Sequence, residues 1–153
     1  MADIKIDVLA EFLDVDSSEI KISHEYDNIY ECGTQEYLIY NENERDGKIC
    51  EYIKELIMDT GWCFNLKLKN YVISDYEGIG ANLWYVANHM EDFCDEEIYS
   101  VVSKGAEYNY IDTGKILTDV ERTNDVGILM ASYDGKENIF EYKNKDYYIY
   151  RCN

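Results

Sequence analysis

Apolar residues recur at the spacing of an α-helix close to the start of the chain. In the segment KIDVLAEFL, residues 5–13, four of them stand at i, i+3, i+4 and i+7: Ile6, Leu9, Ala10 and Leu13. This pattern predicts a short amphipathic helix. Asp3, just before it, is of a residue type that caps helix N-termini.

The same period is clearest in GKICEYIKELIMDTGW, residues 47–62. Gly61 is placed to end this helix. The apolar positions that share its inner face are Ile49, Tyr52, Ile53, Leu56 and Ile57.

Further helical patterns follow in the second half of the chain. Residues 95–105, DEEIYSVVSKG, predict a helix capped by Asp95 and closed by Gly105, and residues 115–123 predict a short helical turn. Residues 81–90, ANLWYVANHM, place four apolar side chains on one helical face: Leu83, Val86, Ala87 and Met90.

Two blocks of the sequence have strand character instead. Residues 19–26, 28–32 and 35–41 are rich in β-branched and aromatic residues with period-two alternation, and they predict a three-stranded antiparallel meander. Residues 126–153 show a similar alternation around the turn formers Asp134-Gly135 and Lys143 to Lys145, and they predict a terminal meander of two or three strands.

Strands in blocks, separated by helices, are typical of the α+β class. The chain has no proline, no low-complexity linker and no internal repeat, so we expect residues 1–153 to form a single α+β domain. A domain of 153 residues buries roughly 70% of the surface of its unfolded chain, so it can fold without disulfides or metals.

Net charge changes this picture most. Thirty-two Asp and Glu residues against fourteen Lys and Arg residues give a net charge of −18. A net charge of magnitude about 2 to 8 suffices to keep a small domain soluble. The charge falls from −11 over residues 1–60 to −5 over 61–110 and −2 over 111–153. Such a field repels nucleic acid and anionic membranes, so we expect direct binding to neither, and cations or basic protein surfaces are the natural partners.

The cysteines and the N-terminal segment bear on location. Five widely spaced cysteines without a CxxC pair are typical of a reduced, intracellular protein. Carboxylates interrupt the N-terminal apolar run, and no stretch approaches 18 uninterrupted apolar residues, so we expect neither a signal peptide nor a membrane anchor.

One short stretch, HMEDFCDEEIY (residues 89–99), concentrates chemistry-bearing residues. His89 and Cys94 are five positions apart and lack the close pairing of zinc ligands. Asp95, Glu96 and Glu97 fit the first turn of a helix, where the helix dipole favours negative charge. That local effect accounts for a handful of carboxylates and leaves most of the net charge unexplained.

Other catalytic and metal patterns are weak. The segment DVDSSEIKISHE resembles a calcium loop, but Glu19 stands where the sharp turn needs glycine. A Cys-His nucleophilic pair could use only His24 or His89 as its base. Both histidines lie in acidic surroundings, and carboxylates near such a pair would raise the pKa of its cysteine and leave less thiolate. No phosphate-binding, dinucleotide-binding, serine-hydrolase or zinc-protease motif occurs. We therefore expect no catalytic residue, no cofactor and no metal.

The sixteen tyrosines have two interpretations. Tyr147, Tyr148 and Tyr150 stand at strand spacing, which favours core positions and cross-strand pairs. Tyrosines beside carboxylates would instead stack on arginines of a basic partner if they are exposed. The candidates for this are Tyr26, Tyr30 and Tyr99.

Two stretches carry a resemblance. AEFLDVDSSEI, followed by YECGTQEYLIYNENE and CEYIKEL, resembles the start of small phage-encoded proteins, and SYDGKENIFEYKNKDYYIYRCN resembles their end. The resemblance covers residues 10–64 and 126–153 and brings no catalytic residue with it. In size, acidity and tyrosine content the chain is also similar to anti-defence proteins, including DNA-mimicking antirestriction proteins and anti-CRISPR proteins.

This similarity implies a phage or mobile-element inhibitor, in the cytoplasm of an infected bacterium, whose carboxylates imitate phosphates. The expected partner is a basic nucleic-acid-binding host protein, a Cas effector or a restriction enzyme, and the oligomeric state, monomer or homodimer, stays open. We expect the partner-binding surface to comprise Asp14, Asp16, Glu19, Glu42, Glu44, Glu91, Asp92, Asp95, Glu96 and Glu97.

Two alternatives remain. An acidic accessory protein that binds through apolar contacts would form complexes insensitive to ionic strength. A small enzyme acting against defence signalling would have a concave pocket with convergent polar groups.

Overall fold

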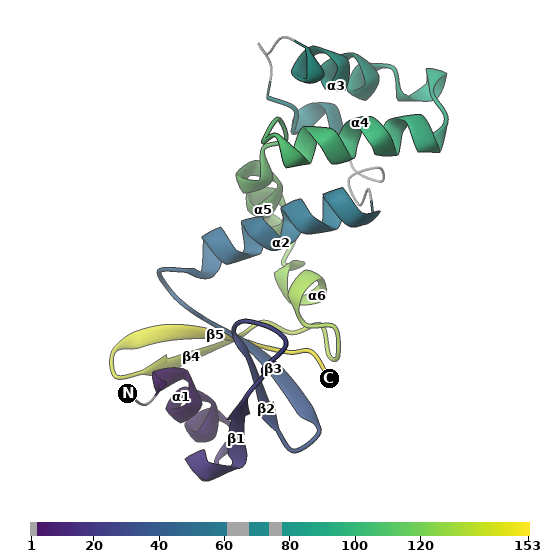
Figure 1. Cartoon of the computed structure of the whole chain (residues 1–153). Coiled ribbons are helices and arrows are strands. Elements are labelled where there is room, and N and C mark those ends of the chain that lie inside the picture. Colours follow the sequence, from purple (N-terminus) through teal and green to yellow (C-terminus); the bar gives the residue numbers. More distant parts are fainter. Residues whose placement is uncertain (1–2, 61–67, 74–77) are drawn as a thin grey trace. The chain divides into compact units, whose positions relative to one another are not determined.

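A computed structural model describes residues 3–60, 68–73 and 78–153 of the chain. It confirms the α+β class, with an N-terminal helix, a strand meander, central helices and C-terminal strands (Figure 1). The predicted helix end at Gly61, and Cys63, lie outside the described residues. The chain divides into two compact units, called here the sheet unit (Met1–Lys48 with Val120–Asn153) and the helical unit (Ile49–Asp119).

The sheet unit contains an antiparallel sheet in the order β1-β2-β3-β5-β4. Its first three strands are the predicted meander, and its last two form the predicted C-terminal hairpin. Strand β3 joins the two blocks by pairing with β5, with Ile39 opposite Ile149. The strands are β1 (Ile20–Ile22), β2 (Ile29–Cys32), β3 (Gln35–Asn41), β4 (Asn138–Tyr142) and β5 (Lys145–Arg151).

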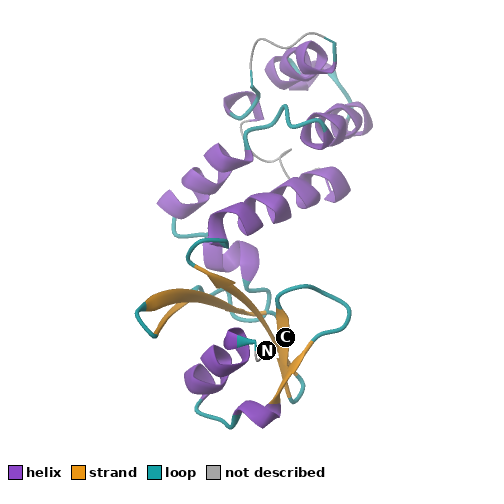
Figure 2. Ribbon diagram, turned by 60° about the vertical axis from the view of Figure 1, so that its left-hand side comes forward, coloured by secondary structure: helices purple, strands orange, loops and turns teal. Residues whose placement is uncertain are grey.

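Helix α1 (Ile4–Leu13) covers one face of this sheet (Figure 2). As predicted, Asp3 caps it, and its carboxylate accepts a hydrogen bond from the amide of Lys5 at 3.0 Å. The apolar stripe of the helix packs on inward-facing strand residues, since burial of apolar area is the main stabilising contribution. This core consists of Val8, Leu9, Ala10, Ile20, Tyr30, Tyr37, Ile39, Tyr147 and Ile149.

Strand β5 is largely buried because both of its faces are covered. Tyr147 and Ile149 point into the core under α1, and the alternation of a strand directs Tyr148 and Tyr150 to the opposite face. Tyr150 is completely buried there. The short helix α6 (Val126–Met130) lies on that side of the sheet (Figure 1).

Helix α6 corrects the prediction of β structure from residue 126 onward. VGILM is apolar without a polar alternation, so its period fits a strand no better than a buried helical turn. In the structure this helix packs closely on the following loop: a Cβ on Gly127 would meet the carbonyl oxygen of Gly135 at 2.5 Å. The hairpin itself turns at Lys143 and Asn144, which both have positive φ as a two-residue type I′ turn requires.

In its described residues, the helical unit contains four α-helices around a core of branched apolar residues. They are α2 (Arg45–Thr60), which begins in the sheet unit, α3 (Ile79–Asn88), α4 (Asp95–Glu107) and α5 (Thr113–Arg122), which ends in the sheet unit. Two short 3₁₀ turns, η3 (Leu68–Asn70) and η4 (Met90–Asp92), connect them. The buried residues include Ile49, Ile53, Ile57, Leu68, Leu83, Val86, Ile98, Val102, Ile116 and Leu117.

Both predicted ends of helix α4 are wrong by a short distance. Cys94 occupies the N-cap, and Asp95 is the first helical residue. Gly105 does not close the helix; it lies inside it, where a Cβ would approach the Leu83 side chain to 2.5 Å. The helix ends instead before Asn109, whose positive φ of 63° reverses the chain. Glycine here serves close packing of α3 on α4.

Candidate partner-binding site

The ten predicted carboxylates fall into three groups in the structure. Asp14, Asp16 and Glu19 follow the end of α1, while Glu42 and Glu44 lie in the turn before α2. The other five lie in the helical unit, on η4 and the start of α4: Glu91, Asp92, Asp95, Glu96 and Glu97.

Two carboxylates of the first group also make hydrogen bonds that stabilise the local backbone. The Asp16 carboxylate accepts a hydrogen bond from the amide of Ser18 at 2.9 Å, and Glu19 reaches back to the amide of Asp16 at 3.1 Å. This is a capping box on the 3₁₀ turn Ser17–Glu19. Hydrogen bonds from Ser18 lower the pKa of Asp16.

The second group is tied into the fold. Glu44 accepts a hydrogen bond from the ammonium of Lys5, which lies at the first turn of α1 and is nearly buried. It also accepts one from the amide of Asn41 at 3.1 Å. Since Lys5 is at the start of the ten-residue α1 and Asp14 at its end, roughly 15 Å of helix separates these two groups.

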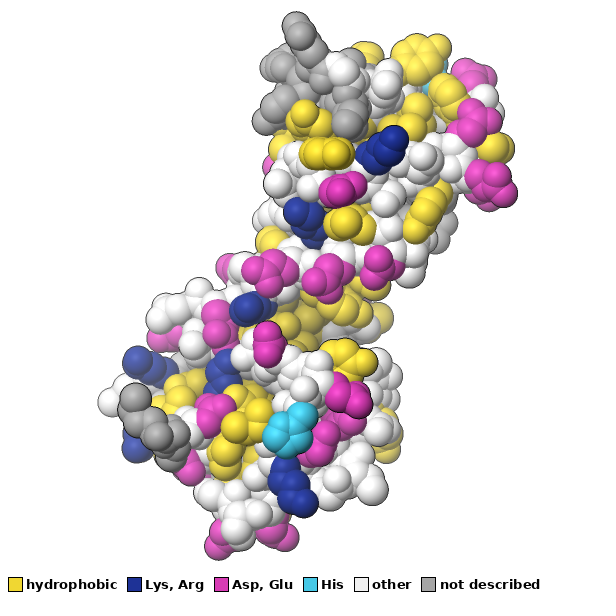
Figure 3. Space-filling view, in the orientation of Figure 1, with side chains coloured by type: hydrophobic (Ala, Val, Ile, Leu, Met, Phe, Trp, Pro, Cys, Tyr) yellow, Lys and Arg dark blue, Asp and Glu magenta, His cyan; other side chains and the backbone are white. Residues whose placement is uncertain are grey.

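The third group, named here the acidic corner, consists of Glu91, Asp92, Asp95, Glu96 and Glu97. All five side chains are exposed. None of the Lys and Arg residues that the structure describes forms an ion pair with them. Figure 3 shows carboxylates gathered at the end of the helical unit where α3 and α4 meet, with hydrophobic side chains among them.

Two features of the local sequence produce this corner. Three of its carboxylates stand in the first turn of α4, where the helix dipole stabilises them. From residue 79 to residue 103 the sequence contains five carboxylates and no Lys or Arg, so this stretch carries −5. All the charged Asp, Glu, Lys and Arg side chains of this stretch are therefore negative.

Aromatic rings stand next to the acidic corner. The ring of Tyr85 stacks on His89 at 4.3 Å between centroids, and Phe93 meets Tyr85 edge-on at 6.1 Å. His89 Nδ1 lies 2.8 Å from the carbonyl oxygen of Tyr85, which fixes the imidazole on the helix end. Tyr85 is 53% exposed, and so its ring is available to a partner.

A groove of about 440 Å³ opens beside these rings, between α3 and α4. Most of its lining is apolar, and two carboxylates of the acidic corner belong to it. The lining residues are Val86, Phe93, Glu96, Glu97, Ser100 and Val101.

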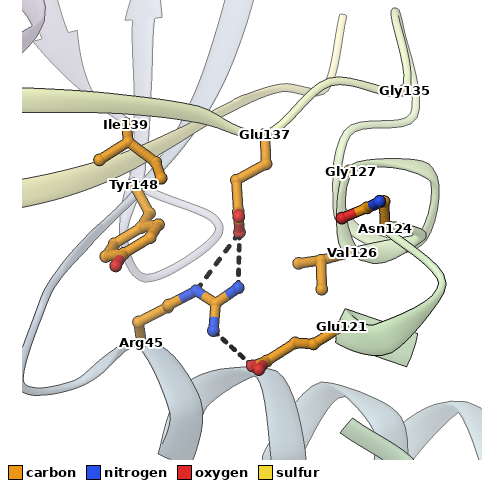
Figure 4. Close-up of a pocket in the computed structure, with 9 residues that line it drawn as sticks. All are labelled: Arg45, Glu121, Asn124, Val126, Gly127, Gly135, Glu137, Ile139 and Tyr148. Carbon is orange, nitrogen blue, oxygen red and sulfur yellow. Dashed lines mark hydrogen bonds and ion pairs between the residues drawn. The ribbon is translucent and has the colours of Figure 1, made fainter. Parts of the chain in front are cut away.

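A different pocket, of about 490 Å³, lies in the sheet unit on the face opposite α1 (Figure 4). Its centre is Arg45, which is only 8% exposed. The guanidinium donates to Glu137 at 2.8 and 3.3 Å and to Glu121 at 2.7 Å, and it lies over the Tyr148 ring at 4.7 Å.

The charges of this pocket are bound to one another. Burial alone would lower the pKa of Arg45, but hydrogen bonds to Glu137, Glu121 and Asp46 outweigh it and raise the pKa. Burial and a hydrogen bond donated to Glu137 raise the pKa of Tyr150. The arrangement holds the start of α2, the end of α5 and the residue before β4 together, and these ion pairs occupy the Arg45 guanidinium.

The histidines and the four described cysteines belong to several different elements. His24 lies in the sheet unit and His89 in the helical unit, and Cys94 donates a hydrogen bond to Glu97 at 3.0 Å. Burial raises the pKa of Cys152, which works against a thiolate. Within residues 3–60, 68–73 and 78–153, no three His, Cys, Asp or Glu side chains are grouped closely enough to hold a metal ion.

The tyrosines considered above differ in their exposure. Tyr147 and Tyr150 are core residues as predicted, and Tyr26 is exposed. Tyr30 is buried and its hydroxyl donates to Asp3, so it is not available to stack on a partner. Tyr99 is half-buried and donates to the Met58 carbonyl at 2.9 Å.

Sequence reasoning missed Arg45 and the groove. The neighbouring sequence gives no sign that Arg45 is buried, because two of its carboxylate partners are far along the chain, at positions 121 and 137. The helical period of residues 81–90 did identify Val86, but not the groove beside it.

Comparisons with protein-family models, with curated proteins and with solved structures find no match to this chain. In the part of the chain that the structure describes, no helix has the length and apolar character needed to cross a membrane.

Proposed function

We propose that this protein is an inhibitor that binds a basic, nucleic-acid-binding protein through the acidic corner and occupies the surface where that protein would hold phosphates. The observation that carries the proposal is the set of five exposed carboxylates between Glu91 and Glu97, none of which pairs with a described cation. Elsewhere in the chain, Glu44, Glu121 and Glu137 neutralise buried Lys5 and Arg45.

Unpaired surface charge costs folding free energy through self-repulsion, so a function that uses it is the economical explanation. Nucleic-acid-binding proteins gain most of their affinity by neutralising phosphates with Lys and Arg. A folded surface with fixed carboxylates presents the same charge to such a groove and is steered to it over a long range. The phage resemblance makes a restriction enzyme or a Cas effector the partner class we propose.

The test is displacement of a labelled DNA or RNA ligand from purified restriction enzymes and Cas effectors by the full chain. The test variant is D95K/E96K/E97K. The matched control is E55K/D59K/E107K, which makes the same charge change at exposed positions of the same unit. We expect the test variant to lose displacement and the control to keep it.

Lysines in the first turn of α4 also destabilise the helix, because each interacts unfavourably with the helix dipole by about 0.3–1 kcal/mol. A neutral variant, D95N/E96Q/E97Q, removes the negative charge without adding lysines and so separates loss of charge from loss of fold. Equal potency of wild type and both corner variants would refute the role of the acidic corner. Failure of the wild type to displace any ligand from the enzymes tested would refute the proposal itself.

A second candidate, an acidic accessory protein with apolar partner contacts, is favoured by exposed apolar side chains on the sheet unit. Ile128 is 69% exposed and Ile139 is 60% exposed. Complexes made through them would persist at high salt, whereas complexes made through the acidic corner would dissociate.

A further inference from the structure

The groove between α3 and α4 combines two chemistries. Val86, Phe93 and Val101 give it apolar walls, and Glu96 and Glu97 give it an acidic edge. Both carboxylates are exposed and continue into the acidic corner. A purely phosphate-like surface has no use for the apolar part.

We propose that this groove binds an amphipathic basic segment of the partner, with an apolar side chain inserted between α3 and α4 and flanking Lys or Arg residues paired with Glu96 and Glu97. This inference rests on the proposed function and narrows its partner to one whose basic surface includes an apolar anchor. Amphipathic helices that dock in grooves use apolar anchors at i, i+3, i+4 and i+7.

Charge complementarity selects this occupant. The residues that line the groove include two carboxylates and no Lys or Arg, and the one cation of the two helices, Lys104, lies in the last turn of α4, away from the first-turn Glu96 and Glu97. An acidic segment would place carboxylates against Glu96 and Glu97, and a neutral apolar segment would remove water from them without supplying a counter-charge, so both are unfavourable. A second copy of this chain brings −18 with it and is disfavoured for the same reason.

The walls of the groove are held in place before any partner arrives. Phe93 is fixed edge-on against Tyr85, and Tyr85 is stacked on His89. The close approach of α3 to α4 is set by Gly105, whose missing side chain leaves room for Leu83. A rigid groove loses little conformational entropy on binding, so its apolar contact converts more fully into affinity.

The experiment uses two fluorescent peptides of about 15 residues and the full chain. The first is a helical Lys/Arg-rich peptide with leucines at i, i+4 and i+7, and the second has serine in place of each leucine at unchanged charge. We expect the wild type to bind the leucine peptide at least tenfold more tightly than the serine peptide in fluorescence anisotropy.

Two protein variants locate the binding. S100W places an indole over the groove from an exposed position of α4, and T118W makes the same addition at an exposed position of α5. We expect S100W to weaken binding of the leucine peptide at least tenfold and to leave the serine peptide unchanged, and T118W to change neither by more than twofold. Circular dichroism of both variants verifies their fold.

Each other outcome overturns the inference. If both peptides bind equally and in a salt-sensitive way, the groove does not bind an apolar side chain, and the proposed function is unaffected. The groove proposal also fails if S100W binds the leucine peptide as wild type does, or if neither peptide binds. Dimerisation of the wild type that S100W abolishes, seen in sedimentation velocity, would identify a second copy as the occupant instead. The ligand-displacement test of the acidic corner decides the proposed function independently.

Discussion

The guanidinium of Arg45 donates two hydrogen bonds, from Nε and Nη2, to Oε2 of Glu137, which lies 92 positions later in the chain. The same oxygen accepts the hydroxyl of Tyr150 at 2.6 Å. This set of contacts fastens the first turn of α2 to the strand block at the C-terminus. It explains how an acidic chain keeps one arginine almost buried.

Replacing Arg45 by methionine should destabilise the sheet unit by about 3 kcal/mol, because Glu137 would be left partly buried without its cation. Urea unfolding followed by near-UV circular dichroism measures this loss. R45K retains the charge but not the bidentate geometry, so its cost should be smaller. A loss below about 1 kcal/mol for R45M would show that the pair is not a principal contact.

Glycines at positions 127 and 47 should respond in opposite directions to alanine. At Gly127 a Cβ would meet backbone atoms of Gly135 at 2.5 Å and Glu137 at 2.7 Å, and backbone cannot move aside as a side chain can. G127A should cost about 3 kcal/mol. G47A adds a methyl group in open space on α2 and should stabilise the protein by about 0.5–1 kcal/mol.

Thermal unfolding of both variants against wild type measures this contrast. Matching transition temperatures for G127A and wild type would mean that α6 does not pack against the 135–137 backbone as described.

Stability should fall steeply in alkaline solution. Burial, followed by hydrogen bonds to Glu137 and Asp3, raises the pKa of Tyr150 and Tyr30 in the folded state. Their neutral forms are therefore favoured by folding. The contribution is complete below the ordinary tyrosine pKa of about 10, and it is lost as the pH rises above that value, by up to about 1.4 kcal/mol per pH unit for each tyrosine.

Urea unfolding between pH 8 and pH 11, as rough limits around the tyrosine value, measures this dependence. Y150F removes one titrating hydroxyl, so its stability should decline less steeply above pH 10 despite a lower value at neutral pH. Y26F alters an exposed tyrosine and serves as the control. Parallel curves for Y150F and wild type would contradict the assignment.

Partner binding should depend strongly on ionic strength. If the acidic corner makes the contact, raising salt from about 50 mM to about 200 mM should weaken binding at least tenfold, since exposed charges are screened within about 10 Å. E96Q/E97Q should reduce that salt dependence, whereas E55Q/E107Q should not. Titrations at several salt concentrations give the slopes, and identical slopes for the two variants would exclude the corner as the contact surface.

The sequence determined most local structure. Asp3 and the i, i+3, i+4, i+7 apolar positions defined α1, and period-two alternation defined β3 and β5, because capping and periodicity depend only on neighbours along the chain. The same local signals misjudged Gly105, since a glycine that ends a helix and one that admits Leu83 look alike in sequence.

Charge illustrates the same division. Along the sequence the net charge falls from −11 over the first sixty residues to −2 over the last forty-three. In the fold, the N-terminal and C-terminal segments form the sheet unit together, and its net charge is −10. The helical unit has a net charge of −8. The count of carboxylates was therefore readable from the start, but which of them are neutralised was not.

Sequence alone thus established the α+β class, most helices and strands, and the acidic run from Glu91 to Glu97. Only the tertiary structure decided that β3 pairs with β5, that Arg45 neutralises Glu121 and Glu137, and that an apolar groove opens beside Glu96 and Glu97. The physical reason is distance along the chain: these contacts join residues whose approach depends on the packing of the whole core, and no local pattern encodes it.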